Sequence, residues 1–226
     1  MGQAIGNILP VALGVAISPL PIVAVVLMLA TPRGKVNGPA FLVGWILGLA
    51  VVGAIVLLVA GGISASSGTA KPKTWVSVLK LVLGLLLGLV AVRQWRRRPH
   101  DEAGPAMPGW MRTIDSFTPV KSLGLAALLS GVNPKNLLLN VSAGAAIAQA
   151  GISGGQQAIV FAIFAAIATL GPGIPLGIYY AMGDRSQATL AGIREWMIRN
   201  NQAIMAVLCL VIGVKLIGDA IGGFTA

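Results

Sequence analysis

The chain of 226 residues is 56% hydrophobic and 10% charged, with a mean hydropathy of +0.88, whereas soluble domains carry about 25% charged residues. This composition excludes a water-solvated globular surface and predicts an integral membrane protein. The formal net charge is +10, but the basic residues lie in short connections between apolar segments. That arrangement is typical of membrane topology signals and not of a nucleic-acid-binding face, so we expect no nucleic-acid partner.

The first half of the chain contains three apolar segments long enough to cross a bilayer. They occupy residues 5–30, 38–62 and 75–94, and about 20 helical residues span a hydrocarbon core roughly 30 Å thick. Midway along the first segment, residues 18–21 read Ser-Pro-Leu-Pro. A proline inside a helix removes a backbone hydrogen bond and clashes with the preceding turn. We therefore expect the first helix to be broken near the membrane midplane.

A polar linker at residues 96–121, which begins with three consecutive arginines, separates this half from the second. The second half has apolar segments at residues 122–150, 154–182 and 202–223. Midway along the first of these, residues 133–136 read Asn-Pro-Lys-Asn, which predicts a second broken helix. The chain is thus expected to divide into a three-helix region at residues 1–95, the linker, and a three-helix region at residues 122–226.

The distribution of Lys and Arg predicts the orientation. Eleven of the 16 lie in the connections after the first, third and fifth segments, whereas Lys71 and Lys73 alone lie on the other side. Because basic connections stay in the cytoplasm, we expect a multi-pass membrane protein with both termini on the extracytoplasmic side. Three segments per half would invert the second half relative to the first. The expected fold is therefore all-α, with six transmembrane helices in two inverted three-helix repeats.

The two predicted breaks form the candidate binding site. In hydrocarbon, carbonyls freed by a proline need a donor from the protein or from a solute. Paired breaks in inverted halves indicate a substrate site near the midplane, and the alternative is that the prolines only kink packed helices. The candidate substrate-binding residues are Ser18, Pro19, Pro21, Asn133, Pro134, Lys135, Asn136 and Asn140.

Lys135 is the most unusual charge in the sequence. It lies about 20 Å into its segment by helical rise, and no acidic residue occurs in the membrane segments except Asp219 near an end. A lysine this deep should face a cavity or a partner. Two interpretations stay open: Lys135 binds an anionic group of the cargo, or carbonyls freed by Pro19 and Pro21 hold it.

Three further charges, Lys80, Lys215 and Asp219, fall in the outer halves of their segments in the predicted orientation. Lys215 and Asp219 are one helical turn apart, so an ion pair is geometrically available. The lysines either extend to the membrane interface or line a cationic outer vestibule.

Glycines mark two further features. Three glycines and two prolines within residues 171–177 predict an interruption of the fifth helix, as a hinge or as close backbone packing. Gly84 and Gly88 form a GxxxG pattern that is typical of a helix-packing face.

The sequence contains no motif that predicts catalysis. It has no phosphate-binding Walker motif, no nucleophile elbow and no HExxH. Cys209 is the single cysteine and lies in an apolar segment, so we expect a small buried side chain there. We therefore expect no enzyme, no metal site and no cofactor.

The six segments, with Pro19 and Pro21 in the first and the Asn-Pro-Lys at 133–135 in the fourth, resemble the LysE superfamily of small membrane exporters. Members usually have Pro-Gly-Pro in the first helix, and Leu20 replaces that glycine here, which argues against an amino-acid cargo. The chain looks most like the GAP, or sulfolipid-addressing protein, family. This resemblance implies a location in the bacterial cytoplasmic (inner) membrane and a role in moving cell-envelope glycolipids.

These observations favour an exporter-like membrane transporter for an amphipathic, anionic or lipid-derived solute. One alternative is a non-catalytic accessory subunit of a lipid-export complex, and another is an exporter of amino acids or small ions. The candidate partners are membrane lipids, a small-molecule or lipid substrate, a second copy of the chain, and a larger lipid-export machinery.

Overall fold

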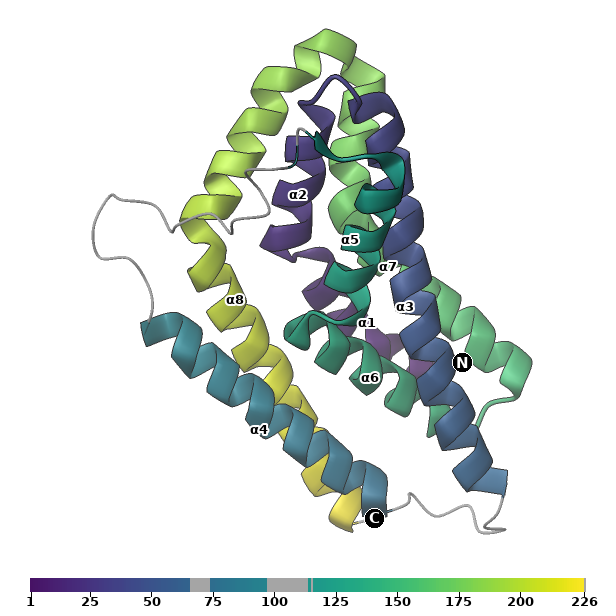
Figure 1. The fold of residues 1–226 in the computed structure, drawn as a ribbon. Helices are drawn as coiled ribbons and strands as arrows, with labels where there is room; N and C mark the ends of the chain where they lie inside the picture. The colour runs from purple at the N-terminus through teal and green to yellow at the C-terminus, as the bar shows by residue number, and fades with distance from the viewer. Residues whose placement is uncertain (66–73, 97–113, 115, 226) are drawn as a thin grey trace.

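The computed structural model describes residues 1–65, 74–96, 114 and 116–225, and every regular element among them is helical (Figure 1). This confirms the all-α class. Lys71, Lys73 and most of the predicted linker lie outside the described residues. In chain order the elements are α1 (Gly2–Ala16), α2 (Pro19–Leu29), α3 (Gly34–Ala65), α4 (Thr74–Arg96), α5 (Pro119–Gly131), α6 (Pro134–Ala148), α7 (Gly154–Met182), the 3-10 turn η2 (Gly183–Arg185) and α8 (Ser186–Thr225).

The first and fourth predicted segments are each broken into two helices. The axes of α1 and α2 differ by 49°, and two residues lie between the end of α5 and the start of α6. In both cases a proline takes the first helical position of the second piece, after the cap residues Ser18 and Asn133. The missing proline N–H costs nothing there, because the first N–H groups of a helix have no partner within it. The two breaks are confirmed, while their depth in the membrane stays a prediction.

The fifth segment is not interrupted, so that prediction is wrong. Helix α7 continues through Pro172 and Pro175. Gly171 explains part of the result, because a Cβ on it would overlap the carbonyl oxygen of Ala16 at the end of α1. The glycine serves close backbone packing between α7 and α1, which was the second of the two expected roles.

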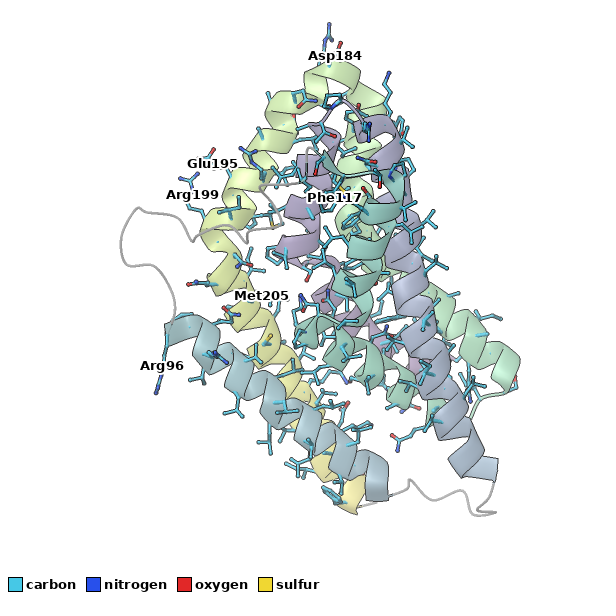
Figure 2. The ribbon with its side chains drawn as sticks, viewed as in Figure 1. Arg96, Phe117, Asp184, Glu195, Arg199 and Met205 are labelled. Carbon is cyan, nitrogen blue, oxygen red and sulfur yellow. The ribbon has the colours of Figure 1, made fainter. Side chains whose placement is uncertain are left out.

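The last helix is longer than its apolar segment. Helix α8 begins at Ser186, well before the predicted residue 202. An exposed pair, Glu195 and Arg199, bridges one turn of this extra part at 3.2 Å, and both project away from the bundle (Figure 2). Asp184 lies at the tip where the chain reverses between α7 and α8 (Figure 2). Gly183 has φ +56° at this turn, a conformation that glycine adopts without strain.

Two helix pairs organise the packing. Helix α4 lies along α8, to one side of the remaining helices (Figure 1). Gly84 and Gly213 face each other there, since a Cβ on either would come within 2.9 Å of the other's carbonyl oxygen. Gly84 thus lies on a packing face, as predicted. On the other side, Gly44 and Gly48 of α3 pack against the backbone of α5.

Length and hydropathy identify several candidate membrane spans in the described part of the chain. They are Gly34–Val59, Ser77–Arg96 and Gly154–Phe224, with the bent pair α1–α2 as a fourth if its halves count as one span. The longest contains both α7 and α8, and the chain reverses between them at η2 (Figure 1). Leu58 and Leu89 are 75% and 67% exposed, as lipid-facing side chains would be. A membrane protein with several spans is confirmed, while the total of six, the inverted repeat and the orientation stay predictions.

Candidate functional site

The two helix breaks meet at Lys135. This residue is the second of α6 and is 3% exposed. Its Nζ donates a hydrogen bond of 3.0 Å to Oγ of Ser18, the cap residue of α2, although the two residues are 117 positions apart. The predicted site residues of both halves therefore come together in one place.

Asn136 completes the backbone at the second break. The Ser18 hydroxyl donates to Oδ1 of Asn136 at 3.3 Å, and Nδ2 of Asn136 donates to the carbonyl of Leu129 at 2.9 Å. That carbonyl is free because the N–H of Asn133, which would reach it in a continuous helix, bonds Leu128 instead. Asn133 in turn caps α6, since its Oδ1 accepts from the backbone N–H of Lys135 at 3.2 Å. A side chain thus replaces the helical donor that the break removes.

Asn140, one turn further along α6, connects the site to α3. Its Nδ2 donates to the carbonyl of Leu49 at 3.1 Å, and the residue is fully buried. Its Oδ1 has no hydrogen-bond partner among the described residues. A buried amide oxygen without a donor costs about 1–3 kcal/mol, so this atom is available to a water or a solute group.

The Lys135 ammonium has unused donors. It carries three N–H groups, and within the described part of the chain Ser18 is its one hydrogen-bond acceptor and no carboxylate pairs with it. The N-terminus of α6, which carries partial positive charge, adds to the field of the lysine. The hydrogen-bond partner of Lys135 is therefore the Ser18 hydroxyl, and not one of the carbonyls freed by Pro19 and Pro21. The combination favours an anion.

Cys209 of α8 belongs to the surroundings of this site. Its thiol is 1% exposed and lies close enough to Lys135 for an electrostatic interaction. The sequence indicates only a small buried side chain here. The neighbour relation could not be predicted, because nothing in a lone cysteine identifies the helix it will face.

The three outer charges also come together. Nζ of Lys215 and Oδ2 of Asp219 form an ion pair at 2.7 Å, so the pairing suggested by their spacing is present. Lys80 of α4 interacts electrostatically with both. Lys80 and Asp219 line a pocket of about 260 Å³ together with polar side chains of α1 and α6.

Comparison with known proteins adds one finding to this geometry. The sequence model of the family described as Sap, sulfolipid-1-addressing protein, matches residues 8–222. The chain belongs to the Sap family. Searches of curated proteins and of solved structures returned no match to the chain.

Membership of the Sap family confirms the family-level resemblance. The match covers both helix breaks and the charged residues Lys80, Lys215 and Asp219, and it indicates no catalytic family. By its description, the Sap family is linked to the addressing of sulfolipid-1. The wider relation to the LysE superfamily stays a prediction.

Several members of the site could not be identified in advance. Gln3, Asn7 and Gln149 line the outer pocket, and the one signal for them is that they are polar residues near the ends of apolar segments. The carbonyls of Leu49 and Leu129 carry no signal at all, because backbone acceptors are the same at every residue.

Proposed function

We propose that this Sap-family chain is an exporter-like transporter that moves, or helps to move, an anionic amphipathic solute across the cytoplasmic membrane. The family description suggests a sulfated or otherwise anionic envelope glycolipid as the cargo. The observation that carries the proposal is the buried Lys135, which has unused N–H donors between two broken helices. A solute anion would supply the missing acceptors, and ion and substrate pathways are where intramembrane charges are retained.

The proposed mechanism uses two inverted repeats, α1–α4 and α5–α8. Three features support this assignment: both repeats open with a broken helix, α3 packs on α5 as α7 packs on α1, and α4 pairs with α8 through reciprocal glycines. In folds built this way, one repeat rocks against the other around a fixed site at their interface. The solute would leave on the side where the termini lie.

The structure corresponds to a closed conformation in this mechanism. Lys135 is 3% exposed and Ser18 is 4% exposed, so a cargo needs a rearrangement to reach them. Separation of α2 from α6 would break two side-chain hydrogen bonds, one from Lys135 to Ser18 and a longer one from Ser18 to Asn136. Both bonds are modest in energy, at about 0.5–3 kcal/mol each.

Transport by the purified protein in proteoliposomes tests the proposal. A fluorescent sulfated glycolipid added to one leaflet should move to the other faster than in protein-free vesicles. Lys135→Gln should lower this rate at least tenfold, because the anion loses its charged partner. Lys121→Gln is the matched control, since Lys121 is exposed at the start of α5, and it should leave the rate unchanged. Equal rates for the two variants would contradict the role of Lys135.

An accessory role without a solute pathway is the second candidate. It is favoured by the mutual bonding of Ser18, Lys135 and Asn136, which would also serve to fasten α2 to α6. In that case purified protein would move no lipid, whereas cells lacking it would fail to export one. Movement without any partner protein would exclude this role.

A further inference from the structure

A polar pocket of about 260 Å³ lies where the start of α1, the outer half of α4 and the ends of α6 and α8 converge. Its polar side chains come from Gln3 and Asn7 of α1, Lys80 of α4, Gln149 at the C-cap of α6 and Asp219 of α8. Four helices from both halves of the chain thus place amide and charged groups around one space. The pocket is separate from Lys135, which lies at the opposite end of α6, about 20 Å away by helical rise.

The charges at this pocket do not cancel. Asp219 is paired with Lys215 at 2.7 Å. Lys80 is partly buried and makes no hydrogen bond or ion pair to any residue that the structure describes, although it feels both of the other charges. Among the side chains, one positive charge is therefore left over, next to three amide groups that can donate to an anion. Met1, whose α-amino group is also cationic, lines the same pocket.

We propose that this pocket binds the monoanionic headgroup of a membrane lipid. A sulfate monoester, a phosphodiester and a carboxylate each carry about one negative charge, which would balance Lys80. The amides of Gln3, Asn7 and Gln149 would donate to the remaining oxygens. The charge-assisted bond from the ammonium is the strong contact, and the amide contacts set the orientation.

The surroundings identify a lipid, not a free ion, as the source of that anion. The pocket is also lined by Met1, Ala146 and Ala150, and Met1 is 44% exposed. These apolar side chains would lie against acyl chains while the headgroup enters the pocket. If the transport proposal holds, this pocket is the station from which cargo leaves after Lys135, whereas lipid binding at the pocket does not depend on transport.

Lipid binding to the intact purified protein tests the proposal. Native mass spectrometry would measure the binding of dioleoyl phosphatidylglycerol and of dioleoyl phosphatidylcholine, which is zwitterionic. The protein should prefer the anionic lipid, and Lys80→Gln should weaken that binding about tenfold or more, the effect of losing one charge-assisted contact. Lys80→Arg should retain it. Lys121→Gln, the remote control, should change nothing.

Charge balance gives a sharper second comparison. Lys215→Gln should also weaken binding, because Asp219 is then free to neutralise Lys80. The double variant Lys215→Gln with Asp219→Asn restores the single net charge and should restore the affinity. A merely structural role for the ion pair predicts the opposite, with the double variant at least as defective as the single one.

Three results would overturn the proposal: equal binding of both lipids, no effect of Lys80→Gln, or inorganic sulfate binding as tightly as the lipid. The third would show an ion site and not a lipid site. The outcome is independent of the transport assay, since binding is measured without flux. Lipid flux without this binding pattern would contradict the proposed lipid pocket alone. The binding pattern without flux would contradict the transport proposal alone.

Discussion

At the scale of single residues, the role of Lys135 distinguishes a transport site from a structural scaffold. Its burial beside Ser18, with no carboxylate paired to it among the described residues, leaves a charge with little compensation inside the protein. Replacing such a charge by an apolar side chain of similar shape often leaves the stability of the protein unchanged or raises it. Replacing a residue that holds helices together lowers the stability. The two roles therefore predict opposite effects on stability.

Lys135→Met should leave the free energy of unfolding within about 1 kcal/mol of wild type, or raise it, while transport is lost. Leu139→Ala, one turn along the same helix at a fully buried position, should lower it by about 2–5 kcal/mol. Thermal unfolding of both variants in detergent provides the comparison. A loss of stability in Lys135→Met as large as in Leu139→Ala would assign the lysine to scaffolding.

The candidate site could be predicted in its side chains and not in its contacts. Prolines beside Ser18 and Asn133 indicated where the backbone would lack donors, and the structure brings Ser18, Lys135 and Asn136 to one place. The acceptors were not predictable, since Leu49 and Leu129 contribute only backbone carbonyls. Only part of the pocket at Lys80 and Asp219 could be predicted. Charged residues stand out in apolar segments, whereas the amides of Asn7 and Gln149 do not.

At the scale of the elements, proline alone does not decide whether a membrane helix breaks. Pro19 and Pro134 begin new helices, whereas Pro172 and Pro175 lie within α7. The difference lies in the neighbours. Asn133 bonds the backbone N–H of Lys135 in place of the helix, and Ser18 bonds Lys135 and Asn136 at the other break. Gly171, by contrast, lets α7 lie directly on the backbone of α1. This tertiary contact was invisible in the sequence of α7 alone.

Two glycines of α7 test this explanation. Gly171→Ala should lower the free energy of unfolding by about 1–3 kcal/mol, because the new Cβ overlaps the Ala16 carbonyl and forces α7 away from α1. Gly177→Ala is the matched control in the same stretch of helix, where a Cβ meets nothing within 4 Å. It should stabilise by up to about 1 kcal/mol, since alanine favours helix. Similar thermal unfolding of the two variants would contradict the packing role.

At the scale of the whole molecule, composition determined the class and the order of apolar segments determined the helices. The all-α membrane fold follows from apolar length and few charges, and the structure agrees. The start of α8 differs from the prediction because an exposed helix is stabilised by pairs such as Glu195 and Arg199, not by hydropathy. The relation between the two halves depends on contacts between distant helices, which the order of segments suggests but does not determine.

Thiol accessibility at the joined breaks tests the central claim, that this protein opens around Lys135 to each side of the membrane in turn. In a Cys209→Ser background, Asp184→Cys and Ser153→Cys at opposite ends of α7 report the two faces. A membrane-impermeant maleimide should modify the first only from the cytoplasm and the second only from outside. Ser18→Cys, 4% exposed in the closed state, should react slowly from both sides. Reaction of Ser18→Cys from neither side, with both reference positions labelled as expected, would contradict the account.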